Sequence, residues 1–406
     1  MITEIGNKQI LSLSIFVTFT ANIPILKIGP FSLSFFFGII LIVFILLKKH
    51  GYLFVDRSLI GLFFLVLVSL FGLILSPVEF NGGSIFSGIQ ICYWIILATI
   101  YANICKIVEV KSYQVSNLII LIFLFLVFLR YPGENGPLSQ NESSYIAVSL
   151  WPFGLELFKN KKRIIYIIFS VILIYLIGSR TGLIICLLQL GTFFALSKFS
   201  SKTIIRFLMI FGLGFVLISN INVRKYAAEK LFPEALDMQI LIENPNIAFQ
   251  MDKSWVQRRI QQEKCKQVFN KYPIIGIGPF NVEKYKIYID PSNIKDVDDR
   301  IFYIEYQHST NRSAHNSYYQ LLAENGIVGM IIIIILLYKV FYGLYKKKNI
   351  SEIYRIILIS AIGLFFNLYM VSAFWGTNTW ILLGIYIGYS RNNSSCRVTK
   401  KTLIPM

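Results

Sequence analysis

Residues 59–76 read LIGLFFLVLVSLFGLILS, an 18-residue run that contains no charged side chain. As an α-helix that rises about 1.5 Å per residue, this run would be about 27 Å long, close to the thickness of a bilayer's hydrocarbon core. Its side chains are apolar on all sides, and a backbone surrounded by lipid must satisfy its hydrogen bonds internally. The run therefore predicts a transmembrane helix.

Similar runs recur along the whole chain. The clearest others are residues 31–47, 85–105, 116–129, 164–178, 183–196, 204–219, 327–338, 356–373 and 380–389, and residues 10–26 and 145–158 are two further candidates. Several of these runs are short, which indicates tilted or bent helices, and Pro152 is expected to bend one of them. We predict an all-α polytopic membrane protein with about 12 transmembrane helices.

The composition agrees with this prediction. Of the 406 residues, 55% are hydrophobic and only 15% are charged, whereas soluble domains carry about 25% charged residues. The net charge of +18 would indicate nucleic acid or an acidic partner if the protein were soluble. In a membrane protein the same excess can instead report orientation.

The distribution of the basic residues decides between these two interpretations. With both termini in the cytoplasm, the cytoplasmic segments hold 22 of the 39 Lys and Arg residues, and the short outer segments hold three. The remaining 14 lie within residues 220–325, where 13 acidic residues balance them. This pattern follows the positive-inside rule, so we predict a multi-pass membrane protein and no binding of nucleic acid.

The charge pattern and the apolar runs also predict a domain organisation. Residues 1–219 form a transmembrane bundle of about nine helices, and residues 315–390 add about three C-terminal ones. Residues 220–314 form one large loop at the outer face between helices 9 and 10, with a polar helix over residues 254–270. Residues 391–406 are a cytoplasmic tail. Loops as long as this one are usually functional.

The sequence predicts neither a disulfide framework nor a metal or cofactor site. Of the five cysteines, only Cys265 would face an oxidising compartment, and it has no partner there. The aspartates Asp296, Asp298 and Asp299 cluster, but their loop lacks the glycine and terminal glutamate of a calcium motif, so a solvated loop explains them more simply.

Three polar segments at the predicted outer face are candidates for function. The first is GSRTG at residues 178–182, which joins two apolar runs and holds Arg180 at the membrane boundary. The arginine either snorkels to the interface or clamps an anion, since a guanidinium matches phosphate oxygens in geometry.

The second segment is the polar helix with the turn that follows it. Arg258 and Arg259 lie on this helix, with Gln262 one turn after Arg258, and the sequence YPIIGIGPFN follows at residues 272–281. Taken alone, two arginines on such a helix usually form a solvated face. The Gly-x-Gly turn allows close approach of the backbone to another element.

The third segment contains His308, Arg312 and His315 just before a predicted span. A histidine there can accept a proton from a hydroxyl near neutral pH, although an interfacial histidine is also often structural. We expect Asn316, Tyr319 and Gln320 to share the first helical turns with His315. Gly326 and Gly329, three residues apart, predict tight helix packing.

Taken together, the three segments resemble the O-antigen ligase and O-antigen polymerase superfamily of bacterial inner-membrane glycosyltransferases. His315 and Asn316, nine residues, and then Gly326-x-x-Gly329 fit that family's H-[NSQ]-x9-G-x-x-G pattern. The SRTG sequence at residues 179–182 fits its S-R-T/A-G turn.

The family also has an R-x-x-x-W helix before a P-x-x-G-x-G turn. Arg258 and residues 273–278 match these motifs, but Gln262 stands where tryptophan is common. Arg258 and Arg259 therefore both stay candidates for the family arginine. The motif matches begin only at about residue 141, whereas the topology is similar throughout.

The resemblance implies a GT-C-like membrane fold and a glycan donor carried on undecaprenyl diphosphate at the periplasmic face. The acceptor would be lipid A–core or a growing glycan, with a chain-length regulator as a further partner. Arg180 and Arg258 or Arg259 would bind the diphosphate, and His315 would activate the acceptor hydroxyl, with inversion and without a metal. The acceptor and support candidates are Asn316, Tyr319, Arg312 and His308.

The alternative from another class is a polysaccharide or lipid flippase, which performs no chemistry. Such transporters predict internal repeats and polar residues in the middle of their spans, and the sequence has neither feature. The motifs do not separate a ligase from a polymerase, and they do not specify the sugar or the linkage.

Overall fold

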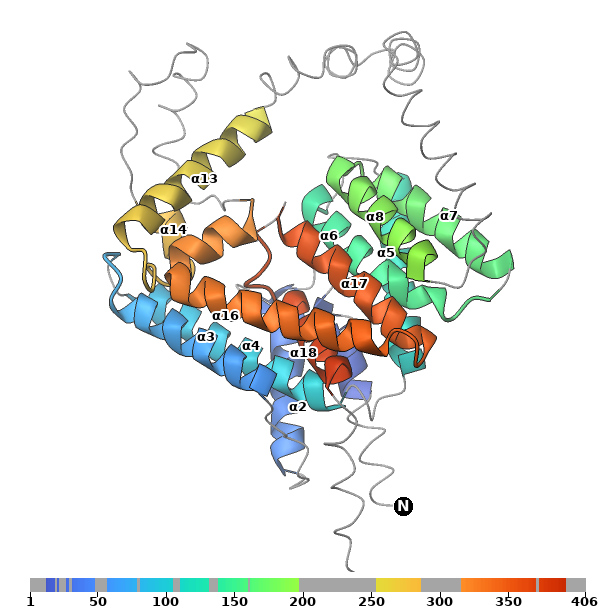
Figure 1. Cartoon of the computed structure of the whole chain (residues 1–406), viewed down its shortest axis with the longest axis horizontal. Helices are drawn as coiled ribbons and strands as arrows, with labels where there is room; N and C mark the ends of the chain where they lie inside the picture. The colour runs from blue at the N-terminus through green and yellow to red at the C-terminus, as the bar shows by residue number, and fades with distance from the viewer. Residues whose placement is uncertain are drawn as a thin grey trace, which may run out of the picture.

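The computed structural model describes residues 12–18, 20–21, 27–28, 31–47, 57–78, 81–104, 110–130, 138–159, 161–196, 253–285, 315–369 and 372–391. The helices labelled in Figure 1 and their neighbours are α2 (Leu33–Leu47), α3 (Arg57–Ile74), α4 (Gly82–Ile104), α5 (Val110–Arg130), α6 (Gln140–Leu150), η2 (Trp151–Leu155), α7 (Lys161–Leu176), α8 (Arg180–Leu196), α13 (Lys253–Lys271), α14 (Asn281–Lys284), α16 (Ser317–Lys347), α17 (Glu352–Leu368) and α18 (Thr377–Ser390). Among these residues the strands are β1 (Lys27–Ile28) and β2 (Phe31–Ser32), a short antiparallel pair. The predicted all-α class is therefore confirmed.

By length and composition, two of the described helices can cross a membrane, α4 and α16. Shorter apolar helices cover Leu33–Ile45, Leu59–Ile74, Gln114–Arg130 and Thr181–Leu196. The number of about 12 spans stays a prediction, and the predicted span at residues 204–219 lies outside the described residues.

The distribution of side chains is that of a protein surrounded by lipid. Phe64, Leu126 and Ile165 are 56%, 59% and 66% exposed, whereas Gln189 and Asn325 are fully buried. Large apolar surface on this scale is unusual for a soluble monomer. It is expected when hydrocarbon surrounds the helices and the polar side chains pair with one another inside the bundle.

Figure 1 shows α17 between two groups of helices. On one side α3, α4, α13 and α14 lie near α16, and on the other side α5–α8 gather. Helices α4 and α18 pack so closely that a Cβ added at Gly384 would lie 2.4 Å from the carbonyl oxygen of Ala98. Only glycine permits that separation, as in other small-residue crossings of membrane helices.

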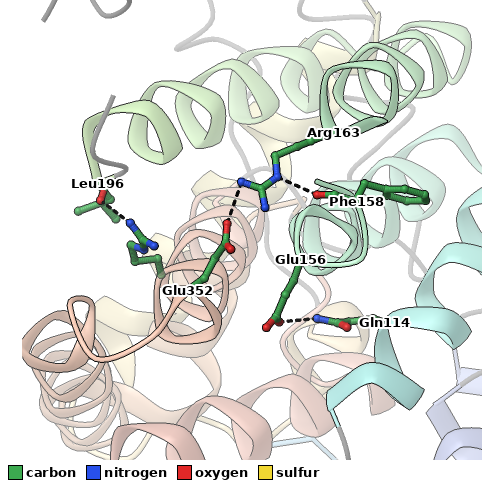
Figure 2. A network of polar contacts seen from close by, with 7 residues as sticks. Gln114, Glu156, Phe158, Arg163, Leu196 and Glu352 are labelled. Carbon is green, nitrogen blue, oxygen red and sulfur yellow. Dashed lines mark hydrogen bonds and ion pairs between the residues drawn. The ribbon is translucent and has the colours of Figure 1, made fainter. Parts of the chain in front are cut away.

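Basic side chains tie several helix ends together at one end of the bundle. Arg163 Nη1 lies 2.9 Å from Glu352 Oε1, which joins the starts of α7 and α17 (Figure 2). Arg355 Nη1 of α17 donates to the carbonyl of Leu196 at 3.2 Å. This bond ties the end of α8 to the start of α17.

The ends of α4, α16 and α18 meet in the same way. Lys347 Nζ donates to the carbonyl of Tyr389 at 3.0 Å and also to that of Arg391. Arg391 Nη1 in turn donates to the carbonyl of Ala102 at 3.3 Å. All of these helix ends belong to segments that the charge pattern assigns to the cytoplasm.

The α-helical geometry of α6 ends just before Pro152, the residue at which the sequence predicts a bend. It ends at Leu150 and continues as the 3-10 helix η2, with Pro152 at its start. Glu156, just beyond η2, accepts a 2.6 Å hydrogen bond from Gln114 Nε2 of α5 (Figure 2). The polar helix predicted over residues 254–270 is confirmed as α13.

Candidate active site

Helix α16 is broken at Gly326, and the turn after α13 fills the break. Gly326 has φ 61° and ψ −164°, a conformation that almost only glycine adopts. Figure 1 shows the first part of α16 bending sharply away from the long second part. A helix break in a membrane bundle leaves backbone groups that need new partners.

The turn at residues 273–278 supplies those partners. The amides of Ile277 and Gly278 donate to the carbonyls of Ala323 and Glu324 at 3.2 and 2.8 Å. The amides of Ile327 and Val328, beyond the break, donate to the turn's carbonyls at 2.8 and 3.2 Å. The P-x-x-G-x-G turn and the break are therefore one hydrogen-bonded unit.

Two glycines of the turn are required by this geometry. Gly276 and Gly278 have φ of 67° and 82°. A Cβ at Gly276 would lie 2.4 Å from the backbone of Glu324, and one at Gly278 would lie 2.5 Å from the amide of Leu73 in α3. The predicted close approach of this turn is confirmed, with α16 and the end of α3 as its partners.

Only one of the two glycines of the G-x-x-G motif packs against a neighbouring helix, as their spacing predicts for both. Gly326 approaches the turn at residues 274–275, and not a neighbouring helix. At Gly329 an added Cβ would meet the side chain of Asn325 at 2.3 Å and that of Leu65 in α3 at 3.5 Å. Packing against a second helix therefore applies to Gly329 alone.

His315 and Asn316 precede α16. Contrary to expectation, they therefore lie outside the first helical turns, which contain Tyr319 and Gln320. Asn316 is the N-cap, and its Oδ1 accepts hydrogen bonds from the amides of Tyr318 and Tyr319 at 3.0 and 3.1 Å. His315 is half-buried and has φ 48°, in the left-handed region. The cap thus fixes the backbone that carries the histidine.

Replacing Asn316 with alanine is expected to lower the free energy of unfolding by about 1 kcal/mol, because two amides lose their acceptor. Asn316→Asp keeps an acceptor and is expected to unfold at the wild-type temperature. Thermal unfolding of the detergent-purified protein measures both. Equal losses for the two variants would contradict a capping role.

The loop before α18 links the start of α16 to α6. Ser317 Oγ accepts hydrogen bonds from the amides of Ala373 and Phe374 at 3.0 and 3.2 Å. The carbonyl of Ala373 accepts from Thr379 Oγ1 at 2.5 Å, and this hydroxyl also bonds to that of Tyr145 in α6. A continuous set of hydrogen bonds therefore runs from the histidine segment to α6.

The SRTG turn packs against the same part of α6. Its Ser179 Oγ accepts from the amide of Gly182 at 3.1 Å, which caps the start of α8. A Cβ added at Gly182 would lie 2.1 Å from Ser144 Oγ, so the turn and α6 are in close contact. Arg180 is the first residue of α8; its side chain lies outside the described residues.

Helix α13 positions Arg258 on the face that packs against α16. Arg258 is half-buried, and Gln261 and Cys265 on the same face are 3% and 1% exposed. Cys265 belongs to a small apolar cluster that includes Ala323 of α16, and its burial raises the pKa of its thiol. The side chain of Arg259, and all of His308 and Arg312, lie outside the described residues.

Helix α14 is joined to α13 by a buried lysine. Lys264 Nζ donates to the carbonyl of Glu283 at 3.1 Å. Burial lowers the pKa of Lys264 and raises that of Glu283. This bond fixes the segment after the glycine turn against the helix that carries Arg258.

Several of the buried polar atoms without a hydrogen-bond partner in the described part of the chain lie beside these motifs. They include Ser144 Oγ next to the SRTG turn, Asn316 Nδ2 next to His315, and both side-chain polar atoms of Asn378 at the start of α18. Buried polar groups normally have partners. The unpartnered donors and acceptors beside the motif segments are therefore suited to binding a polar ligand.

An aromatic cluster that the motifs do not predict lies at this end of the bundle. Trp375 stacks on Trp94 of α4 and on Trp380 of α18, with ring centroids 6.1 and 5.8 Å apart, and Phe280 lies beside it. The available signal was the short polar break before α18, since tryptophans concentrate at membrane boundaries.

Comparison with known proteins adds one match. Residues 165–334 match a family model described as O-antigen ligase. The matched segment contains all three motif segments, from the SRTG turn to the break in α16. No curated protein matches the chain.

Proposed function

The O-antigen ligase domain at residues 165–334 assigns this chain to the O-antigen ligase and polymerase superfamily, and from this premise we propose that it is a membrane glycosyltransferase. It takes a glycan from undecaprenyl diphosphate at the periplasmic face of the bacterial inner membrane. The acceptor is a sugar hydroxyl of lipid A–core or of a growing lipid-linked glycan. The fold is of the GT-C-like class.

The observation that carries this proposal is the contact between the three motif segments through the helices next to them. The P-x-x-G-x-G turn bonds to the break in α16, and Ser317 at the start of α16 bonds to the loop at residues 372–376. From that loop, the hydrogen bond between the hydroxyls of Thr379 and Tyr145 reaches α6, and the SRTG turn packs on α6. Motifs that are up to about 140 residues apart thus support one site.

The proposed chemistry is a single displacement. The bond between the anomeric carbon and the diphosphate oxygen breaks, and the leaving oxygen takes the electron pair. The acceptor hydroxyl oxygen forms the new glycosidic bond and gives its proton to His315, as in general-base catalysis. Attack opposite the leaving group inverts the anomeric carbon.

Arg180 and Arg258 hold the diphosphate and stabilise the charge that develops on it. Because a diphosphate is already a good leaving group, this proposal requires no cofactor. Asn316 fixes the histidine segment, and its unpartnered Nδ2 is suited to an acceptor oxygen. Tyr319 supports the same turn, and His308 and Arg312 remain acceptor candidates.

We also propose the topology that the charges predict, with both termini cytoplasmic and residues 220–314 periplasmic. The cluster of Arg163, Lys347, Arg355 and Arg391 at one end of the bundle supports a cytoplasmic location for that end. The motif segments, which are linked through the helices next to them, lie at the opposite helix ends. Labelling from either side of the membrane tests this, with single cysteines introduced into a chain whose five native cysteines are replaced.

Arg258 is expected to matter more than Arg259. Arg258 shares a face with Gln261 and Cys265, which pack toward α16, whereas Arg259 is about 100° further around the helix. Arg258→Ala should lower transfer by about 100-fold, and Arg258→Lys should restore only part of it, since lysine lacks the rigid fork. The matched control is Arg259→Ala, with the initial rate measured against donor concentration. A larger loss for Arg259→Ala would reverse the assignment.

Complementation of strains that lack either activity tests the function and separates the two subclasses. On a lipopolysaccharide gel, a ligase would restore polymer on lipid A–core, whereas a polymerase would convert a single-repeat band into a ladder. Rescue of neither strain by a chain that inserts normally would count against the proposal. Restored lipid export without a new glycosidic bond would favour the flippase alternative.

A further inference from the structure

Glu324 is a fully enclosed acidic residue on the first part of α16, with 0% of its surface exposed. Its carboxylate accepts three hydrogen bonds. Oε1 accepts from the amide of Phe280 at 2.7 Å and from Gln320 Nε2 at 3.1 Å, and Oε2 accepts from Trp375 Nε1 at 2.9 Å. An enclosed carboxylate is tolerated only with such donors around it.

The three donors come from three different segments of the chain. Phe280 follows the glycine turn, Gln320 lies one helical turn before Glu324, and Trp375 belongs to the loop before α18. Glu324 is thus a point at which the turn, the start of α16 and the Trp375 loop are held together.

The same face of α16 leads to His315. Ser317, Gln320 and Glu324 are buried at spacings of three and four residues, which places them along one side of the helix. Ser317 holds the amides of Ala373 and Phe374 in the loop that contains Trp375. Both ends of this short helix are therefore fixed to one loop. His315 lies two residues before its first residue, Ser317.

We propose that Glu324 is a positioning residue for glycan transfer. Its carboxylate holds the helical segment at residues 317–325 against the glycine turn and the Trp375 loop, and so determines where His315 is presented. Glu324 acts through the helix over about 10 Å and touches no substrate. This inference rests on the proposed function.

The substitution Glu324→Gln tests the proposal because it keeps the shape and removes one acceptor. An amide has one accepting oxygen and one NH₂ group, so one of the three donors must face another donor. The better orientation keeps the oxygen toward Phe280 and Gln320 and turns the NH₂ group toward Trp375 Nε1. Removing the indole N–H with Trp375→Phe should therefore relieve the defect in this variant.

The experiment uses the full chain in nanodiscs with an undecaprenyl-diphosphate-linked glycan as donor. Glu324→Gln is expected to lower kcat by about 10- to 100-fold, since a displacement near 1 Å can cost 100-fold, with KM for the donor within about threefold of wild type. Trp375→Phe should lower kcat in the wild-type background and raise it in Glu324→Gln. The control is Glu352→Gln, at the opposite end of the bundle, with wild-type kinetics expected.

Wild-type kcat in Glu324→Gln, or no gain from Trp375→Phe in that background, would overturn the proposal. If each substitution only destabilised the fold, the double variant would lose more kcat than either single variant. A loss from Trp375→Phe in the wild-type background and a gain in Glu324→Gln therefore identify positioning. If Glu324→Gln does not yield folded protein by size-exclusion chromatography, Gln320→Leu and Trp375→Phe replace it. Wild-type kcat in both would then overturn the proposal. An inactive wild-type chain would instead refute the proposed function.

Discussion

Replacing His315 is expected to lower kcat for glycan transfer by about 10²- to 10⁴-fold, because the acceptor hydroxyl loses its general base. His315 has φ 48°, a conformation that costs about 1–2 kcal/mol for most residues and less for asparagine. His315→Asn is therefore a cleaner test than His315→Ala, since it removes the imidazole with less strain on the backbone.

Both variants should insert into the membrane, and His315→Asn should unfold within a few degrees of wild type. Transfer is measured as product formed per folded protein in nanodiscs. Wild-type activity in folded His315→Asn would remove the histidine from the mechanism. Recovery of activity in either variant at high pH, where the hydroxyl needs less assistance, would support the general-base role.

Gly326→Ala is expected to lower the free energy of unfolding by about 4 kcal/mol or more, near the upper limit for single substitutions. Alanine at this φ and ψ carries about 1–3 kcal/mol of strain. Its Cβ would also lie 2.2 Å from the carbonyl oxygen of Ile274. The turn must then move, which breaks the hydrogen bonds that bridge the break in α16.

Gly61→Ala is the matched control. Gly61 lies inside α3 and a Cβ there meets nothing within 4 Å, so alanine should stabilise the helix by up to about 1 kcal/mol. Thermal unfolding and membrane abundance of the two variants are compared. Equal stability of Gly326→Ala and Gly61→Ala would contradict the described break.

The sequence was sufficient for features that depend on nearby residues. Apolar runs predicted the helices because burial in lipid requires length and hydrophobicity alone. The polar helix over residues 254–270 is α13 (Lys253–Lys271), and the bend at Pro152 follows from the missing amide of proline. The N-cap role of Asn316 was also within reach, since asparagine before a helical run is a start signal.

Features that depend on distant partners were not accessible in this way. The spacing of Gly326 and Gly329 predicted helix packing, but the partner of Gly326 is a turn some 50 residues earlier in the chain. Glu324 counted only as a charge, because its donors Phe280 and Trp375 are far from it in sequence. The roles of Arg180, Arg258 and His315 stay predictions.

Glycosyl transfer by this chain requires that it form a glycosidic bond. The direct test is purified protein in nanodiscs, an undecaprenyl-diphosphate-linked glycan and either lipid A–core or a second lipid-linked repeat as acceptor, read by mass spectrometry. We expect an acceptor heavier by the donor glycan, with one undecaprenyl diphosphate released per bond, and neither product with His315→Asn. Unchanged acceptors of both kinds, with the intact donor moved across the bilayer of a proteoliposome, would contradict glycosyl transfer by this chain.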